Sequence, residues 1–295
     1  MNNESGNILE IKNLKKEYKN FTLKDVTFNL PYGYIMGLIG PNGAGKTTII
    51  KLIMNLIAKN EGIVEVFGKD NIKDEVEIKS KIGFVYDIPP FYEHLNLTQN
   101  KYIVSQFYSN WNEELFREYI NRFDLDLSSK FKILSRGMKM QFQLAIALSH
   151  NADFIILDEP TSGLDPIFRR ELLGIFSELI QSEKKSILFS THITSDLERI
   201  ADFITFINDG EIVFSEEKDI ILETWGVVKG SNDILNEDLE SLLYGIKKHE
   251  FGFEALTSNI REVASVNKTD LKIEKPTLED IMFFISSSNG TGSRQ

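Results

Sequence analysis

The chain contains no cysteine, which excludes disulfides and thiolate metal sites and fits a reducing cytoplasm. It also lacks any apolar run near the ~18 residues that a membrane-spanning helix needs. The first seven residues have neither the basic nor the apolar segment of a secretory signal, so none is expected. Any association with a membrane is therefore expected to go through a partner protein.

Basic residues are outnumbered by acidic ones, 33 against 44, which gives a formal net charge of −11. This balance disfavours a nucleic-acid partner, because such proteins present a basic face to the phosphate backbone. With 42% hydrophobic and 26% charged residues, the composition is that of a soluble globular protein. A chain of 295 residues can bury one large core, or one core plus a small appendage.

The most informative stretch is GPNGAGKT at residues 40–47, which matches the phosphate-binding pattern G-x-x-x-x-G-K-[ST]. The run 34–39 before it predicts a buried strand, and the run 48–56 after it predicts a helix. Glycines allow consecutive N–H groups to face one anion, and the helix N-terminus adds its positive end. Lys46 supplies a mobile positive charge for the outer phosphates, and the Thr47 hydroxyl is placed to ligate Mg²⁺.

The remaining pattern predicts an α/β fold. Strands alternating with helices indicate a mainly parallel sheet covered on both faces. Strands are predicted over 8–14, 22–30, 62–68, 82–87, 154–158, 186–190, 203–208 and 211–214. Helices are predicted over 98–108, 113–123, 137–149, 166–181, 194–200 and 276–285. The Asp-Gly pair at 209–210 predicts that the last two core strands form a hairpin.

We therefore predict a phosphate-loop nucleotide hydrolase core with an N-terminal β subdomain and an inserted helical subdomain. This ATPase-type domain is expected over residues 1–224, with the helical part at about 88–150. A small α+β accessory domain is expected over 225–285. The Ser- and Gly-rich segment 286–295 is predicted to be a disordered tail.

Two acids, Asp158 and Glu159, end the apolar run 154–157. In a parallel sheet that end faces the ligand crevice. Asp158 suits a Mg²⁺ partner beside Thr47, and Glu159 suits polarisation of an attacking water. The alternative is a solvated strand end, which two adjacent acids in a chain with a phosphate loop make less favourable.

Several other residues carry information only in combination. Ser135 can cap the helix that follows it, and Gly137 allows a phosphate close to the backbone, although an ordinary capped helix has the same pattern. His192 directly follows a predicted strand, where a structural role is the commoner one. Tyr18 fits a half-buried strand aromatic equally well.

Taken in order, these pieces resemble the ATP-binding-cassette (ABC) ATPases over about residues 8–214. The resemblance implies that Tyr18 stacks on the adenine of ATP and that His192 contacts the γ-phosphate. Ser135 and Gly137 would touch the γ-phosphate of ATP bound to a partner subunit, and Asp165 would lie at the subunit interface. The phosphates themselves would be held by Gly40, Asn42, Gly43, Ala44, Gly45, Lys46, Thr47 and Thr48.

The resemblance also implies two ATP molecules, with Mg²⁺, at the interface of a sandwich dimer. One phosphate loop per chain then requires a second subunit, identical or related. Glu159, His192 and Lys46 would carry catalysis, and Thr47 and Asp158 would hold the metal.

Two motifs depart from the family pattern. In the usual signature L-S-G-G-Q, Arg136 takes the place of the first glycine and Met138 that of the glutamine. Asp87 takes the place of a glutamine after the strand 82–86. A carboxylate can still approach Mg²⁺ but cannot donate a hydrogen bond, so Asp87 is expected as a metal ligand on weaker grounds than Thr47 and Asp158.

The form LSRGMKM at 134–140 and the ending PTLEDI at 276–281 look most like bacterial exporter ATPases for antimicrobial or amphipathic peptides and drugs. Such a subunit would lie on the cytoplasmic face of the cell membrane, bound to an integral membrane subunit. The segment 87–97, rich in Pro and aromatics, would form the groove for that partner, although its aromatics could equally be core.

Two other functions stay open. A soluble ABC ATPase acting on DNA or ribosomes is disfavoured by the acidic charge and by the absence of a long coiled-coil insertion. A nucleotide-gated interaction module with low turnover would keep the same motifs and differ in steady-state ATPase rate.

Overall fold

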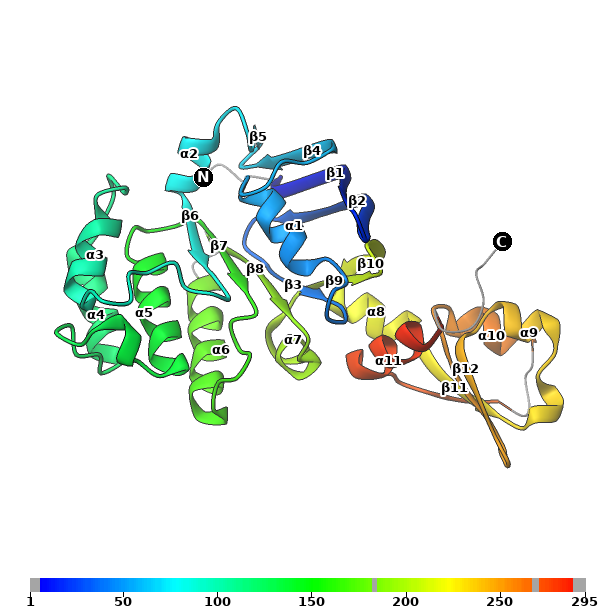
Figure 1. Ribbon diagram of the computed structural model, residues 1–295. Helices are drawn as coiled ribbons and strands as arrows, with labels where there is room; N and C mark the ends of the chain where they lie inside the picture. The colour runs from blue at the N-terminus through cyan, green and yellow to red at the C-terminus, as the bar shows by residue number, and fades with distance from the viewer. Residues whose placement is uncertain (1–5, 182–184, 267–270, 289–295) are drawn as a thin grey trace. The chain divides into compact units, whose positions relative to one another are not determined.

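The computed structural model describes residues 6–181, 185–266 and 271–288 (Figure 1). Their chain forms two compact units. The first takes residues from 1–193 and 205–214, and the second takes residues from 194–204 and 215–295. The second unit thus starts ahead of the boundary predicted at residue 224 and includes the helix α7 (Thr194–Ile200). The predicted boundary itself, as the limit of an independent domain, stays a prediction.

The first unit begins with a four-stranded antiparallel sheet in the order β2-β1-β4-β5. Its strands are β1 (Asn7–Tyr18), β2 (Phe21–Pro31), β4 (Glu61–Val66) and β5 (Lys69–Asp70). Leu9, Ile11 and Leu14 of β1 are fully buried. One apolar face of this sheet is therefore covered by the rest of the unit, as the predicted N-terminal β subdomain requires.

The second sheet of this unit has six strands in the order β10-β9-β3-β8-β7-β6. These are β3 (Ile35–Ile39), β6 (Ile82–Val85), β7 (Phe154–Asp158), β8 (Ser186–Thr191), β9 (Phe203–Asn208) and β10 (Glu211–Glu217). The pairs β3–β8, β8–β7 and β7–β6 are parallel. Every residue of β3, β7 and β8 is buried, because a parallel sheet is covered on both faces. The predicted α/β class is confirmed.

Some helices pack on this sheet, and others form a separate group beside it. The helix α1 (Lys46–Ile53) packs against both β4 and β7 and so lies between the two sheets (Figure 1). A short α2 (Glu75–Ser80) precedes β6, and α6 (Pro166–Ile180) packs against β8. Beside β6 and β7, Figure 1 shows a helical group of α3 (Leu97–Ser105), α4 (Glu113–Arg122) and α5 (Arg136–Leu148).

The helical group has an aromatic core centred on Phe142 of α5. Its ring lies 5.0 Å from that of Phe91, 6.1 Å from Phe131 in the 3-10 turn η1 (Phe131–Ile133) and 6.5 Å from Phe116. The group is joined to the sheet where α5 crosses β6, since a Cβ at Gly83 would lie 2.5 Å from the Ala147 carbonyl oxygen. Only glycine permits this approach, so α5 is held close to β6.

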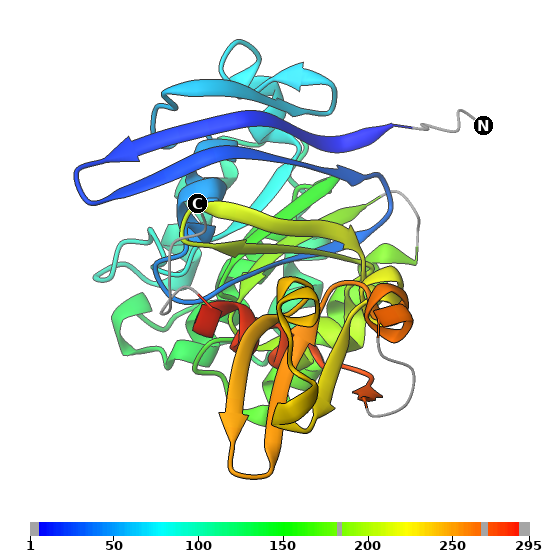
Figure 2. The ribbon, with the colours of Figure 1, turned by 90° about the vertical axis from the view of Figure 1, so that its right-hand side faces the viewer.

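The second unit contains a four-stranded antiparallel sheet in the order β12-β13-β11-β14 (Figure 2). Its elements after α7 are α8 (Lys218–Thr224), β11 (Gly226–Gly230), η2 (Asn232–Ile234), α9 (Glu237–Ser241), β12 (Tyr244–His249), β13 (Gly252–Thr257), α10 (Ile260–Val266), β14 (Lys272–Glu274) and α11 (Leu278–Ser288). Phe253 and Ala255 of β13 pack with Leu239 of α9 and Val263 of α10. This is the α+β arrangement expected for the appendage.

The last helix runs past its predicted end. Residues 286–288 of the predicted tail belong to α11, and residues 289–295 lie outside the described residues. Ile281, Phe284 and Ile285 are buried, and α11 packs on β12 and β13, so packing carries the helix beyond the point where the composition becomes polar.

None of the helices in the described ranges combines the length and the apolar character that crossing a membrane demands.

The aromatic core of the helical group can be tested by Phe142→Ala. Phe142 is fully buried, so the change leaves a cavity and should lower the free energy of unfolding by about 3–5 kcal/mol. Urea unfolding followed by circular dichroism measures it. The matched control is Phe107→Ala, which truncates a ring that is 79% exposed and should leave the midpoint nearly unchanged. Equal effects of the two changes would contradict the described core.

Candidate functional site

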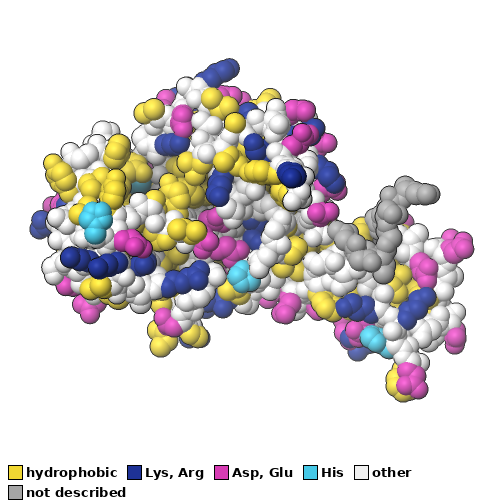
Figure 3. All heavy atoms as spheres, in the orientation of Figure 1, with side chains coloured by type: hydrophobic (Ala, Val, Ile, Leu, Met, Phe, Trp, Pro, Cys, Tyr) yellow, Lys and Arg dark blue, Asp and Glu magenta, His cyan; other side chains and the backbone are white. Residues whose placement is uncertain are grey.

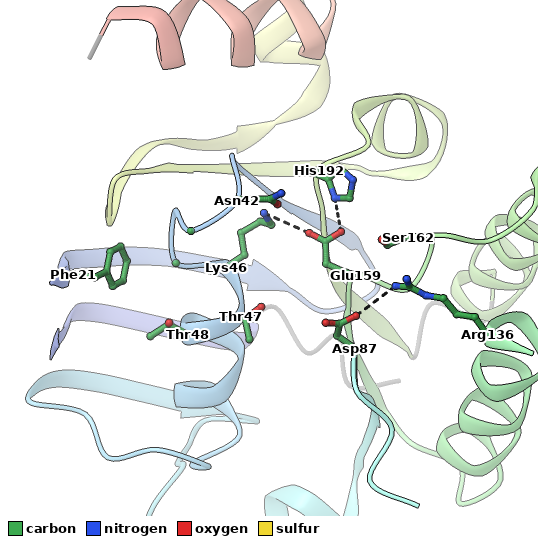
Figure 4. A pocket seen from close by; sticks show the side chains of 12 residues that line it. Phe21, Asn42, Lys46, Thr47, Thr48, Asp87, Arg136, Glu159, Ser162 and His192 are labelled. Carbon is green, nitrogen blue, oxygen red and sulfur yellow. Dashed lines mark hydrogen bonds and ion pairs between the residues drawn. The ribbon is translucent and has the colours of Figure 1, made fainter. Parts of the chain in front are cut away.

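A cavity of about 500 Å³ opens in the first unit at the carboxyl edge of the parallel strands (Figure 4). This is the edge at which the loops after β3, β6, β7 and β8 meet, because parallel strands end on the same side. The cavity is lined by Phe21, Asn42, Gly43, Gly45, Lys46, Thr47, Thr48, Asp87, Arg136, Glu159, Ser162 and His192. Residues as far apart in the sequence as Phe21 and His192 are thereby brought to one site.

The loop after β3 has the conformation that its glycines allow. Gly45 has a φ of 118° and stands immediately before α1, so the helix begins directly from a left-handed residue. Gly40 passes the neighbouring strand so closely that a Cβ there would lie 2.2 Å from the Ile207 carbonyl oxygen. The loop is thus packed against β9 and turned at the helix N-terminus, where N–H groups and the helix dipole favour an anion.

Lys46 connects this loop to the acid pair. Its ammonium Nζ donates to the carbonyl oxygens of Gly40 at 2.8 Å and Pro41 at 3.3 Å, and it lies 3.4 Å from Oε1 of Glu159. The other carboxylate oxygen of Glu159 is 2.8 Å from Nδ1 of His192. The side chains of Lys46 and Glu159 are only 6% and 15% exposed, so this charge pair is largely shielded from water.

Glu159 is held in an unusual backbone conformation. Its φ is 51°, a left-handed value that costs a non-glycine residue on the order of 1 kcal/mol. Its N–H donates to the hydroxyl of Ser190 on β8 at 2.9 Å. The turn directs the carboxylate into the cavity, toward Lys46 and His192 (Figure 4).

The Asp158 carboxylate lies beside the hydroxyl groups of Thr47 and Ser190. Its Oδ1 accepts hydrogen bonds from the Thr47 hydroxyl at 3.1 Å and from the Ser190 hydroxyl at 2.7 Å. Burial raises the pKa of Asp158, the two hydrogen bonds oppose that rise, and the charges of Asp87 and Glu159 add to it. A carboxylate with a hydroxyl, at a phosphate loop, is the donor chemistry that Mg²⁺ prefers, so these residues fit that ion.

Asp87 reaches the same cavity from the end of β6. Its Oδ1 lies 3.6 Å from Nη2 of Arg136, the first residue of α5. The backbone next to it is fixed by the buried Gln143 of α5, which accepts from the Tyr86 N–H and donates to the Tyr86 carbonyl, both at 3.1 Å. Two of the residues that depart from the family pattern, Asp87 and Arg136, therefore contact each other.

Seven of the predicted site residues are not among the described residues that line this cavity, namely Tyr18, Gly40, Ala44, Ser135, Gly137, Asp158 and Asp165. Ser135 caps α5 by accepting from the Met138 N–H at 3.2 Å, and Gly137 lies in the first turn of that helix. Asp165 caps α6 by accepting from the N–H groups of Ile167 and Phe168, both at 3.0 Å. Tyr18 is 45% exposed, with its ring 6.4 Å from that of Phe21.

Gly40 and Ala44 belong to the phosphate loop without lining the cavity, and the other phosphate-loop residues that were predicted do line it. The structure adds Phe21, Arg136 and Ser162 to the lining, and it adds Gln143 through its contact with Tyr86. Phe21 had a sequence signal as the second aromatic of the same hairpin as Tyr18, and Arg136 had one as a departure inside the signature motif. The contact of Gln143 with Tyr86 spans 57 residues and has no local signal.

Comparison with known proteins shows the family to which the chain belongs. Residues 23–162 match the ABC transporter family. The chain is 39% identical over 215 residues to the lantibiotic transport ATP-binding protein SrtF of Streptococcus pyogenes, covering 72% of this chain and 92% of that one. It is 32% identical over 209 residues to the bacitracin transport ATP-binding protein BcrA of Bacillus licheniformis, covering 70% and 68%.

Solved structures agree in fold. The chain matches the ATP-binding subunit of an ABC transporter with a TM-score of 0.67 and 29% identity, over 73% of this chain and 92% of that one. It also matches a dimeric ATP-binding cassette bound to ADP and Pi, with a TM-score of 0.63 and 24% identity, over 71% and 98%. The chain therefore belongs to the ABC transporter family and is one of its ATP-binding, ATP-hydrolysing subunits.

Proposed function

We propose that this chain is the ATPase subunit of a bacterial exporter of amphipathic or antimicrobial peptides or drugs. The observation that carries the ATPase part is the convergence of Lys46, Glu159 and His192 on the phosphate loop. The cargo class is supported by the similarity to transport proteins named for a lantibiotic and for bacitracin.

The chain's own groups supply most of the chemistry. Lys46 binds the outer phosphates of ATP, which replace Glu159 as partners of its ammonium. The Glu159 carboxylate is then free to accept a hydrogen bond from the attacking water, while His192 holds its second oxygen and contacts the γ-phosphate. Catalysis of this kind is positioning and charge stabilisation rather than covalent chemistry.

Thr47 and Asp158 would hold Mg²⁺, with Asp87 as a further carboxylate at the same edge of the cavity. The Thr47 hydroxyl oxygen and Oδ1 of Asp158 lie 3.1 Å apart, which supports this role for both residues. When bound, the ion neutralises charge on the phosphate oxygens.

A second subunit would complete each site. Ser135, Gly137 and Asp165 stand at the N-terminal ends of α5 and α6, where backbone N–H groups suit an anion. Since they do not line the described cavity of their own chain, they are available to the γ-phosphate and the interface of a partner subunit.

The partner for export would be an integral membrane subunit, which would place this chain at the inner face of the cell membrane. Figure 3 shows hydrophobic side chains gathered over the region of α3 and β6. Ile88 and Tyr92 of the predicted docking segment are 82% and 54% exposed, and Phe107 is 79% exposed. Phe91 from the same segment belongs instead to the aromatic core, so the segment serves both roles.

Glu159→Gln tests the proposed catalytic role. The neutral amide keeps the shape of the side chain but is a far weaker base than the carboxylate. ATP turnover should therefore fall at least about 100-fold, while nucleotide binding is retained. Phosphate release measures turnover, and gel filtration with ATP should show the variant accumulating as a dimer. Glu216→Gln, an exposed change on β10, is the control and should hydrolyse ATP at the wild-type rate.

Full hydrolysis by the Glu159→Gln variant would contradict the assignment. A wild-type rate at background would instead favour the low-turnover interaction module, and failure to co-purify with an integral membrane protein would favour a soluble ABC ATPase.

A second pair of variants tests whether Phe21 or Tyr18 stacks on the adenine of ATP. Phe21 lines the cavity and Tyr18 does not, so Phe21→Ala should raise the Kd of ATP by about 5-fold, the loss of one aromatic stacking contact. Tyr18→Ala should raise it less. Isothermal titration measures both, and a larger effect of Tyr18→Ala would favour the stacking role expected from the family resemblance.

A further inference from the structure

Arg136 occupies a position that disfavours a cation. It is the first residue of α5, directly after the cap Ser135, and the N-terminal end of a helix carries partial positive charge. A guanidinium there needs an acidic partner to offset the repulsion. Asp87, from a different part of the chain, supplies that partner at 3.6 Å.

The guanidinium is also seated against the loop that follows the acid pair. A Cβ built on Gly163 would lie 2.9 Å from Nη1 and 3.1 Å from Cζ of Arg136. Gly163 has a φ of 68°, so glycine suits both the turn and the contact. Arg136 thus connects α5, the end of β6 and the loop after β7 at the wall of the cavity (Figure 4).

Arg136 and Gln143 act on the same strand end. They are seven residues apart, which places them on one face of α5, two turns from each other. Gln143 holds the backbone of Tyr86 with two hydrogen bonds, and Arg136 holds the side chain of the next residue, Asp87. The first contact is made by a side chain that is only 3% exposed, whereas the ion pair is half exposed, at 56% for Arg136 and 50% for Asp87. An exposed pair of this kind is weak enough to exchange partners.

The Asp87 carboxylate also lines the cavity together with Thr47, one of the two residues proposed to hold the metal (Figure 4). Its charge acts on Asp158, which accepts the Thr47 hydrogen bond. One carboxylate therefore lies between a guanidinium on one side and the oxygen atoms suited to Mg²⁺ on the other.

We propose that Arg136 and the Mg²⁺-loaded nucleotide compete for the Asp87 carboxylate, which makes Arg136 a positioning residue that ties metal binding to the contact between α5 and β6. This rests on the proposed role of Asp87 toward Mg²⁺. If Asp87 binds the metal, the hydrogen bonds between Gln143 of α5 and the Tyr86 backbone remain, whereas the ion pair between Arg136 and Asp87 is broken.

The competition is tested by nucleotide binding without turnover. The quantity measured is the Mg²⁺ effect, defined as the Kd of a nonhydrolysable ATP analogue in EDTA divided by its Kd in saturating Mg²⁺. Arg136→Gln frees Asp87 and should increase the Mg²⁺ effect roughly two- to five-fold, the range expected for removing one exposed ion pair. Arg136→Lys keeps a cation at the site and should stay near the wild-type value.

Two controls separate competition from a general change in charge. Lys132→Gln removes one positive charge from the exposed turn just before α5, outside the lining of the cavity, and should leave the Mg²⁺ effect unchanged. In an Asp87→Asn background, Arg136→Gln should no longer change the Mg²⁺ effect, because the contested carboxylate is gone.

The competition is overturned if Arg136→Gln changes the Mg²⁺ effect equally in both backgrounds, or no more than Lys132→Gln does. It is also overturned if Asp87→Asn keeps the full Mg²⁺ effect while Thr47→Val loses it, and in that case the proposed ATPase function stands. If the wild-type chain fails to bind the analogue at all, the proposed function fails with it.

Discussion

The charge on Lys46 is the constraint on which the site depends. An ammonium that is only 6% exposed must have partners, and it finds them in two backbone carbonyls of its own loop and in Glu159. The phosphate loop can be this tight because Gly40 and Gly45 admit backbone and side chains that a Cβ would exclude. The ion pair in turn joins the loop after β3 to the loop after β7, so the cationic and acidic halves of the site are built as one network.

The same network explains why the acids tolerate strain. Glu159 adopts a left-handed φ, and Asp158 is buried with a raised pKa, both of which cost stability. Ser190 offsets part of that cost, because its hydroxyl donates to Asp158 and accepts from the Glu159 backbone. A small hydroxyl residue on the neighbouring strand thereby positions both acids, the one proposed to bind metal and the one proposed to polarise water.

The helix α5 gives the site its second wall. Phe142 anchors it in the aromatic core, Gly83 lets it approach β6, and Gln143 fixes the backbone before Asp87. Arg136 then places a charge at the cavity from the first turn of the same helix. Packing, hydrogen bonding and charge at the site are thus coupled through one element, which makes α5 the structural link between the nucleotide site and the exposed apolar residues around α3.

Local sequence patterns were enough to predict the α/β class, most strands and helices between residues 8 and 214, and the phosphate loop with its acid pair. These follow from local features, namely glycine spacing, apolar periodicity, and polar residues at the ends of buried strands. The sequence by itself did not determine that Phe21 rather than Tyr18 lines the cavity, that α11 continues to Ser288, or that Asp87 meets Arg136. Those points are visible only in the folded chain, because each depends on contacts between segments that lie far apart in the sequence. No local pattern predicts which distant side chain will make such a contact.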